Sequence, residues 1–296
     1  MTAMEAARTA LKEVFGYDDF RAGQEDAVAA ILRGREVMAV MPTGAGKSLC
    51  YQIPALVLPG ITLVVSPLIS LMRDQVSALL QYGVRAAYLN STLTPRQYML
   101  ALDNARRGVY RIIYVAPERL MTDSFLNFAR NADIAQVVVD EAHCVSQWGQ
   151  DFRPGYLNIA PFLNALEKRP RLSAFTATAT KTVRDDIIRL IGLREPHAIL
   201  TGFDRPNLFL EVRRPKDRDA ELRRFLEEHK GQSGIVYCGT RKGVEEVTRM
   251  LQDCGVDAVG YHAGMGDEMR SRAQEDFVSD RSPVIVATNA FGMGID

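Results

Sequence analysis

The residues best suited to chemistry lie between Met41 and Ser48, a stretch that reads Met-Pro-Thr-Gly-Ala-Gly-Lys-Ser and follows a short apolar run. Gly44 and Gly46 would let the backbone turn so that successive N–H groups point at phosphate oxygens. Lys47 would add a positive charge, and Ser48 would offer a hydroxyl to Mg²⁺. The strict pattern asks for glycine at the first position, but the Gly-x-Gly-Lys-Ser core is intact. We therefore predict a phosphate-binding loop; the alternative is a glycine-rich turn without a ligand.

A second reactive group follows the apolar run Val137 to Val139, which ends in two adjacent carboxylates, Asp140 and Glu141. In enzymes with a phosphate loop, the metal is shared between the loop hydroxyl and an aspartate, while another residue orients the attacking water. Ser48 and Asp140 would then hold Mg²⁺, and Glu141 would polarise the water. Acidic residues after a strand often only cap a helix or form a turn, so this role depends on the phosphate loop.

Length and composition place these residues in an ordinary globular protein. The chain has 296 residues, which suits two domains, with 47% hydrophobic and 24% charged side chains. No run of eighteen apolar residues occurs, and the N-terminal residues show no long apolar segment. Neither a membrane partner nor a secretory signal is expected.

The cysteine pattern argues against a cysteine-based metal site, and the net charge argues against nucleic-acid binding through bulk charge. The four cysteines are scattered without a C-x-x-C pair, so we expect reduced, structural thiols and no cysteine-based metal site. The 36 basic and 36 acidic side chains cancel. Any contact with a nucleic acid must therefore come from a local surface and not from bulk charge. His197 and His229 lie in polar, turn-rich surroundings and are expected to be solvated.

Strand-like apolar runs that alternate with helix-length segments position the reactive residues. In the first part of the chain these runs are 36–40, 61–66, 110–115, 135–139 and 171–176. A second series is expected near 207–212, 234–238, 258–261 and 283–287. Such alternation predicts an α/β fold with parallel sheets, whose ligands sit beyond the carboxyl ends of the strands. We expect one lobe over residues 1–201, a linker over 202–207, and a second lobe over 208–296.

Asp140-Glu141-Ala142-His143 after a phosphate loop resembles the DEAH box of superfamily two helicases, and the surrounding sequence resembles the RecQ family of DNA helicases. The resemblance covers nearly the whole chain. In the first half it rests on residues 20–24, 66–75, 116–119 and 173–179. In the second half it rests on residues 203–207, 237–238, 261–264 and 287–294. It implies two RecA-like lobes of the P-loop NTPase class.

The resemblance also implies site residues for ATP and Mg²⁺. Tyr17 would stack on the adenine while Arg21 and Gln24 select it; without the resemblance, Tyr17 would be a surface aromatic and Gln24 a solvated helix residue. The residues expected to bind the nucleotide are Tyr17, Arg21, Gln24, Thr43, Gly44, Ala45, Gly46, Lys47 and Ser48. The residues expected to act in catalysis are Lys47, Asp140, Glu141 and His143, with Ser48 and Asp140 as metal ligands.

The segment from Cys144 to Tyr156 holds the only tryptophan, Trp148, and resembles the aromatic-rich loop of RecQ proteins. Aromatic rings that stack on unpaired bases, helped by an arginine on phosphate, commonly hold single strands. The alternative is a buried aromatic cluster, but Gly149 and Pro154 favour a loop. The residues expected to bind DNA are Ser66, Arg73, Gln75, Arg119, Trp148, Phe152 and Arg153.

The chain departs from the RecQ pattern in three places. Gln150 stands where histidine is usual, Gly155 stands where an acidic residue is common, and Ala45 replaces a usual glycine. The sequence also ends at Asp296, before a Gln-x-x-Gly-Arg-x-Gly-Arg segment could supply an arginine finger. We therefore expect an incomplete second lobe and a chain that binds ATP but hydrolyses it poorly.

The function implied by the resemblance is that of an ATP-dependent 3′→5′ DNA helicase, which couples ATP hydrolysis to translocation and unwinding in recombination and repair. Its partners would be single-stranded and partly duplex DNA, while protein partners are not predicted. Its location would be the cytoplasm, beside the nucleoid, in a bacterium, or the nucleus in a eukaryote. Two alternatives stay open, an RNA helicase and an ATP-gated single-stranded DNA-binding module without unwinding.

Overall fold

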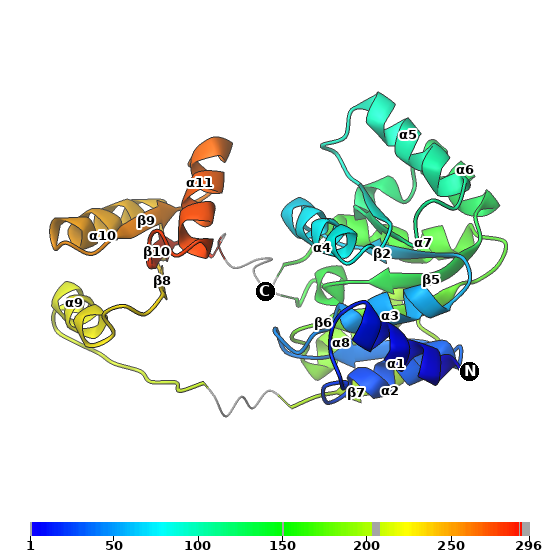
Figure 1. Ribbon diagram of the computed structural model, residues 1–296, viewed down its shortest axis with the longest axis horizontal. Coiled ribbons are helices and arrows are strands. Elements are labelled where there is room, and N and C mark those ends of the chain that lie inside the picture. The colour runs from blue at the N-terminus through cyan, green and yellow to red at the C-terminus, as the bar shows by residue number, and fades with distance from the viewer. Residues whose placement is uncertain (1, 150, 203–207, 290, 292–296) are drawn as a thin grey trace. The chain divides into compact units, whose positions relative to one another are not determined.

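The structure is a computed structural model that describes residues 2–149, 151–202, 208–289 and 291 (Figure 1). The chain divides into two compact units, which meet in the sequence at residues 204 and 205. Both are built on parallel sheets, one of seven strands and one of three. The predicted α/β fold with two parallel-sheet units is confirmed, and the second unit is the smaller.

The larger unit is a seven-stranded parallel sheet in the order β3-β4-β2-β5-β6-β1-β7. Its strands are nearly continuous apolar runs because helices cover both faces. The strand bounds are β1 Val37–Val40, β2 Ile61–Val65, β3 Ala86–Leu89, β4 Ile112–Val115, β5 Ile134–Val139, β6 Arg171–Thr176 and β7 His197–Leu200. The strands β5, β6 and β1 are neighbours, so the loops that follow them lie at one edge of the sheet.

Two hydrophobic cores fill the two faces of this sheet. One contains buried side chains of the first four helices: α1 Ala3–Glu13, α2 Gln24–Leu32, α3 Leu49–Val57 and α4 Ile69–Gln81. The other contains those of α5 Pro95–Arg106, α6 Asp123–Asn131, α7 Ile159–Asn164 and α8 Lys181–Ile191. Short 3₁₀ helices complete the unit: η1 Pro117–Arg119, η2 Ala142–Val145 and η3 Pro154–Asn158.

Side-chain caps explain where several of these helices begin. The Thr2 hydroxyl accepts a hydrogen bond from the Glu5 N–H, and the Glu5 carboxylate accepts one from the Thr2 N–H. Thr94 and Gln97 form the same reciprocal box at the start of α5. Thr180 caps α8 by accepting from the Val183 N–H. Each cap satisfies backbone donors that would otherwise lack a partner in the first turn.

The smaller unit has a three-stranded parallel sheet in the order β8-β10-β9. Its elements are α9 Arg218–Glu228, β8 Gly234–Tyr237, α10 Arg241–Asp253, β9 Ala258–Tyr261, α11 Asp267–Val278 and β10 Val284–Ala287. The central strand β10 is fully buried, whereas the burial of β8 alternates between partial and none. Its two core clusters are correspondingly small.

The strand expected near 207–212 is wrong for the described part of that range. Residues 208–212 form no strand, and Phe209 and Leu210 are 86% and 89% exposed. Their β-forming composition was the basis of the prediction, but a strand needs a neighbour to pair with, and none of the described strands pairs with this segment.

The sequence analysis did not predict two of the strands. One of them, β7, contains His197, which was expected to be solvated. The strands β3 and β7 are four residues each, too short for a clear periodicity, and β7 follows Pro196 and starts with a histidine. His197 is not simply solvated, since its Nε2 lies 2.9 Å from Asp26 Oδ2 and its Nδ1 lies 3.3 Å from Arg35 Nη1. Those contacts join β7 to α2 and to the turn before β1.

No helix among the described residues is long and apolar enough to cross a membrane. All four cysteines lie in the described part of the chain and are free, as expected.

Phe125 provides a test of the core beneath α6. It is fully buried and packs against Phe128 and Phe162, each with a centroid distance of 5.7 Å. Because Phe125→Ala would leave a cavity in close-packed surroundings, we expect it to lower the free energy of unfolding by about 3–5 kcal/mol. Urea denaturation followed by circular dichroism would measure the change. Leu100→Ala, at a position 60% exposed, is the control and should shift it by less than about 0.5 kcal/mol. Equal shifts would contradict the assigned core.

Candidate nucleotide site and the loop beside it

The predicted phosphate loop connects β1 to α3. Its first residue, Met41, extends the pairing with β6 through a hydrogen bond from its N–H to the Thr176 carbonyl, 3.0 Å long. Gly44 and Gly46 have φ angles of 78° and 72°, in the left-handed region that favours glycine. Lys47 and Ser48 follow at the point where α3 begins. The loop therefore ends at a helix N-terminus, where the helix dipole favours an anion.

Arg21 and Gln24 hold this loop from the side. The Arg21 guanidinium donates through Nη1 to the Gly44 carbonyl at 2.7 Å. The Gln24 amide donates through Nε2 to the Ala45 carbonyl at 2.9 Å and to the Gly46 carbonyl at 3.1 Å. Gln24 is 1% exposed and its Oε1 accepts from the Arg21 N–H, so it is not a solvated helix residue. Both side chains set the shape of the loop in this structure.

A cavity of about 180 Å³ adjoins the loop. Tyr17 lines it and is 43% exposed, so one part of its ring is open to solvent. The remaining lining is largely apolar with a few polar groups: Phe15, Gly46, Ser48, Leu49, Gln52, Gln75, Ala78, Leu79 and Tyr82. Such a mixture suits a flat heterocycle better than a charged group.

Gln75, which the sequence analysis assigned to DNA, faces the interior. Its Oε1 accepts from Gln52 Nε2 at 2.9 Å and from the Tyr114 hydroxyl at 3.3 Å. Gln52 also donates to the Tyr114 hydroxyl at 3.2 Å. The three side chains thus join α3, α4 and β4 below the cavity. In this structure Gln75 has a structural role that its position in a motif did not reveal.

The two carboxylates follow β5 directly. Asp140 is 6% exposed, its Oδ1 accepts from the Glu141 N–H at 3.0 Å, and its carbonyl accepts from the Tyr156 hydroxyl at 2.8 Å. Glu141 has φ 46° and ψ 47°, a left-handed conformation that is strained for a residue with a side chain. The surrounding contacts hold it there.

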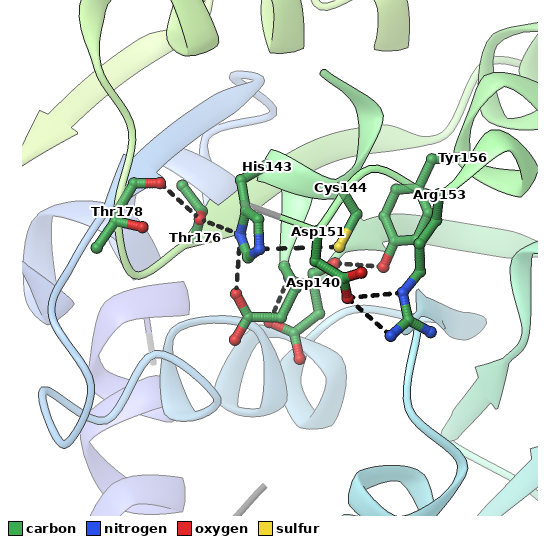
Figure 2. Close-up of polar contacts among 9 residues, drawn as sticks. Asp140, His143, Cys144, Asp151, Arg153, Tyr156, Thr176 and Thr178 are labelled. Atoms are coloured by element: carbon green, nitrogen blue, oxygen red, sulfur yellow. Dashed lines mark hydrogen bonds and ion pairs between the residues drawn. The ribbon is translucent and has the colours of Figure 1, made fainter. Parts of the chain in front are cut away.

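His143 lies between the Glu141 carboxylate and the end of β6, and Figure 2 shows its contact with Thr176. Its Nδ1 lies 2.9 Å from Thr176 Oγ1 and 3.2 Å from Glu141 Oε2. The Thr176 hydroxyl donates its proton to the Thr178 carbonyl at 3.2 Å, so it must accept from His143. We therefore assign a proton to Nδ1, which donates it to Thr176, while the Glu141 carboxylate lies within ion-pair distance of the same nitrogen.

The environment of Glu141 favours its charged form. Burial by itself would raise the pKa of this carboxyl group. The hydrogen bond from His143 and the attraction of His143 and Lys47 together outweigh burial, and the net pKa is lowered. Glu141 is therefore ionised at neutral pH, as a residue that accepts a proton from water must be.

The donor set suits a hard cation that brings further ligands with it. Ser48 and Asp140 supply a hydroxyl and a carboxylate, the oxygen ligands that Mg²⁺ prefers. Within the described residues, no three His, Cys, Asp or Glu side chains are placed to hold a metal ion together. A Mg²⁺ at Ser48 and Asp140 would depend on phosphate oxygens and water for its remaining ligands.

The segment 146–153, hereafter the Trp148 loop, begins just after η2, and Gln150 within it lies outside the described residues. Trp148 is 78% exposed, which is incompatible with a buried aromatic cluster. Gly149 packs so closely on the His143 carbonyl that a side chain would not fit there. The loop therefore presents its indole to solvent while its backbone rests against the DEAH segment.

Arg153, expected to contact phosphate, is occupied by protein. Its guanidinium donates to Asp151 Oδ2 at 2.9 and 2.7 Å and to the Pro67 carbonyl at 2.5 Å. Its N–H donates to the Cys144 carbonyl at 2.8 Å. Arg153 thus fastens the end of the Trp148 loop to the segment that follows β2, and Phe152 beside it is half-buried.

Two other residues assigned to DNA meet at a turn that the sequence analysis missed. Arg73 donates to Thr92 Oγ1 at 3.2 Å, and Arg119 donates to the Asn90 carbonyl at 3.3 Å. Asn90 Oδ1 accepts from the Thr92 N–H at 3.0 Å and from its hydroxyl at 2.8 Å. Ser66, by contrast, is fully buried. The Asn90–Thr92 turn follows β3, so recognising that strand would have revealed it.

The motif residues of the smaller unit are only partly described. Residues 203–207, 290 and 292–296 lie outside the described part of the chain. His262 is 7% exposed, and its Nδ1 accepts from the Gly264 N–H at 3.1 Å. Its Nε2 lies 3.4 Å from Glu245 Oε1. These contacts order the turn after β9.

Comparison with known protein families decides the assignment. Residues 21–186 match the family model of the DEAD/DEAH box helicases, and residues 217–296 match the helicase conserved C-terminal domain. The chain belongs to the DEAD/DEAH box helicase family. Membership of this family implies that the chain binds ATP.

Relatives of this helicase core confirm its resemblance to RecQ. It is 42% identical to the ATP-dependent DNA helicase RecQ of Bacillus subtilis over 99% of the chain and 50% of that protein. It is 44% identical to RecQ of Haemophilus influenzae over 98% of the chain and 47% of that protein. The ATP-dependent helicase wrn-1 of Caenorhabditis elegans is 41% identical over 99% of the chain and 28% of that protein. The chain spans about half of the two RecQ proteins and less of wrn-1.

Solved structures share the fold of this helicase core at low identity. The Mycobacterium smegmatis helicase Lhr, bound to single-stranded DNA and AMP-PNP, has a TM-score of 0.71 at 20% identity, covering 100% of the chain and 42% of Lhr. The DUF1998 helicase MrfA, bound to DNA, has a TM-score of 0.76 at 19% identity, covering 100% of the chain and 43% of MrfA. These likenesses support the two-sheet helicase fold alone.

Gly46 allows a test of how this helicase core shapes its phosphate loop. Gly46→Ala would place a methyl group in a left-handed conformation and against the Gln24 amide. Gly83→Ala is a matched control, because Gly83 has φ 74° but a methyl group there would meet no atom within 4 Å. Both variants should lose about 1–2 kcal/mol of stability from backbone strain, measured by urea denaturation. Only Gly46→Ala should also lose binding of a fluorescent ATP analogue, and equal binding by both variants would refute the role of this contact.

Proposed function

We propose that this chain is the motor core of a RecQ-type ATP-dependent DNA helicase, which couples ATP hydrolysis to 3′→5′ movement along a single strand and to unwinding. The observation that carries the proposal is the arrangement of the phosphate loop, the Asp140–Glu141–His143 segment and the exposed Trp148 at one edge of one sheet. The relatives named as DNA helicases support the choice of substrate. The whole protein's work in recombination and repair, close to chromosomal DNA, follows from the same proposal.

The phosphates of ATP would lie against the loop that precedes α3. Lys47 would neutralise charge on them, and the N–H groups of the loop would donate to their oxygens. Ser48 and Asp140 would hold Mg²⁺, which neutralises charge that develops on the phosphates. Glu141 would orient the attacking water and accept its proton, while His143 keeps the Glu141 carboxylate in place through Nδ1.

The adenine would enter beside Tyr17, whose ring lines the cavity next to the loop. Arg21 and Gln24 would select the base, as expected from the family pattern. Both side chains now donate to loop carbonyls, so Gln24 would have to release at least one of its two bonds to donate to a base. Base recognition would thereby change the hydrogen bonding of the loop that holds the phosphates.

DNA would contact the same unit through aromatic and polar side chains. Trp148 is exposed and free to stack on an unpaired base, and Phe152 follows four positions along the chain. Arg73 and Arg119 flank the Asn90–Thr92 turn, where the Thr92 hydroxyl and the two guanidinium groups would contact a phosphate backbone. Arg153 would support these contacts by holding the Pro67 carbonyl, and Gln75 by holding the Gln52 and Tyr114 side chains, since the polar groups of both are engaged with protein.

Residues 1–201 would form the first lobe, 202–207 the linker and 208–296 the second lobe, with movement produced by closure on ATP and opening after hydrolysis. If DNA is bound but not unwound, the chain is an ATP-gated clamp. A preference for RNA strands would instead favour an RNA helicase.

Lys47 and Glu141 provide the test of the nucleotide chemistry. In steady-state assays with single-stranded DNA, both Lys47→Ala and Glu141→Gln should lower ATP hydrolysis by about 100-fold or more, because each removes a group that acts in the transition state. They should differ in binding, since Lys47→Ala loses a phosphate contact whereas Glu141→Gln keeps all of them. Hydrolysis retained by Glu141→Gln would exclude Glu141 as the residue that activates water.

Trp148 provides the test of DNA coupling. Trp148→Ala should weaken binding of single-stranded DNA by about 5-fold to 150-fold, which corresponds to the loss of one stacked base. It should also reduce stimulation of ATP hydrolysis by saturating DNA while leaving ATP affinity unchanged. Leu100→Ala, which removes another exposed apolar side chain, is the control. A full DNA response from Trp148→Ala would contradict the proposal, and stronger stimulation by RNA than by DNA would favour the RNA helicase.

A further inference from the structure

Ser146 is a buried serine at the root of the Trp148 loop, and its hydroxyl has two partners. The side chain is fully buried, directly after η2. Its Oγ donates to Asp186 Oδ2 at 2.7 Å and accepts from the Trp148 N–H at 3.2 Å. A hydroxyl has one proton, so donation to the carboxylate leaves a lone pair for the peptide N–H. The Trp148 backbone is thus tied through one hydroxyl to α8.

Asp186 is well placed to be the fixed end of this connection. Val183, Ile187 and Ile191 bury one side of α8 in the core, so the helix is held firmly on the sheet. The second carboxylate oxygen, Oδ1, accepts from Arg189 at 2.7 Å. The hydrogen bonds from Ser146 and Arg189 lower the pKa of Asp186, so it is ionised at neutral pH. A charged acceptor makes the bond from Ser146 stronger than one between neutral groups.

The same part of the sheet also holds His143. The strand β6 supplies Thr176, which accepts from His143, and α8 follows β6 in the chain. The backbone between the two anchor points is continuous, with the Ser146 N–H donating to the His143 carbonyl at 3.1 Å. The segment from Glu141 to Trp148 is therefore fixed twice, at His143 and at Ser146, by one strand and the helix after it.

The orientation of the exposed Trp148 ring depends on contacts that hold the backbone at its base. With 78% of Trp148 exposed, its ring has little contact with the protein, and its direction depends on the backbone at its base. Arg153 fixes the far end of the loop through the Cys144 and Pro67 carbonyls. Asp186 and Ser146 are the corresponding contact at the near end, next to the DEAH segment.

We propose that Asp186 is a positioning residue that, through the Ser146 hydroxyl, holds the Trp148 loop in register with His143 and Glu141, so that DNA bound at Trp148 stimulates ATP hydrolysis. The proposal rests on the proposed function. It assigns Asp186 no contact with ATP or DNA, and it predicts that loss of the anchor uncouples DNA binding from hydrolysis without disabling the nucleotide site.

Trp148 itself reports on the anchor, because it is the only tryptophan in the chain. In the full chain without DNA, Asp186→Ala and Ser146→Ala should lower the fluorescence anisotropy of Trp148, as its segment gains motion. ATP hydrolysis without DNA should stay within about twofold, whereas stimulation by single-stranded DNA should fall about fivefold or more. Because Ser146→Ala breaks the bond to Asp186 and also removes the acceptor of the Trp148 N–H, the double variant should be no worse than Ser146→Ala alone.

Three further variants separate this role from a general effect on folding. Asp185→Ala removes an exposed carboxylate from the neighbouring position of α8. Arg189→Ala removes the ion pair of Asp186 but keeps its bond to Ser146. Both should behave like the unmodified chain in anisotropy and DNA response. Asp186→Asn keeps an oxygen that can accept from Ser146, and it should restore most of the DNA response lost in Asp186→Ala.

The outcomes distinguish the inference from the proposed function. If the unmodified chain shows no DNA-stimulated hydrolysis, the proposed function fails, and the relay role of Asp186 fails with it. If the unmodified chain responds to DNA and Asp186→Ala responds equally, only the role of Asp186 is refuted. Equal loss of hydrolysis with and without DNA, together with a lower thermal midpoint, would also overturn it, since that pattern marks a structural contact.

Discussion

The candidate nucleotide site depends on the pairing of β5, β6 and β1 as neighbouring parallel strands. The register places Val40 beside Thr176 and Val139 beside Ala174, so all three strands end at the same edge. The phosphate loop, the acidic pair and Thr176 are distant in sequence, yet each follows or ends one of these strands. Parallel pairing therefore gathers the reactive groups before any side-chain contact forms, and the two buried cores on either face keep the edge rigid.

Local hydrogen bonds then give each group at that edge its orientation, at some conformational cost. Glu141 sits in a left-handed conformation, and its buried carboxylate stays charged because His143 and Lys47 outweigh desolvation. The phosphate loop contains two glycines with positive φ, and its carbonyls are engaged by Arg21 and Gln24. A site held this way is preorganised, which in the proposed reaction would lower the reorganisation needed when charge develops.

Much of this arrangement could be read from the sequence, because it depends on local patterns. Continuous apolar runs identified the buried strands, and glycine spacing identified the phosphate loop. Strands of four residues with a polar start, such as β7, gave too weak a signal, and residues 208–212 had β-forming side chains but no described strand to pair with. The inward roles of Gln75 and Arg153 depend on partners far along the chain, Tyr114 and Pro67, which no local pattern reveals.

Local sequence and long-range contacts also both matter for how DNA bound at Trp148 would affect the nucleotide site. Trp148 lies five residues after His143, so only a few backbone torsions between them can absorb a displacement of the indole. Short spacing alone would not suffice, because an unsupported loop would absorb the displacement as local motion. The anchors at Thr176, Asp186 and Pro67 remove that freedom from both ends of the segment. In the proposed coupling, DNA binding would be transmitted by a short segment held at its ends, and the sequence shows the segment while the fold supplies the restraints.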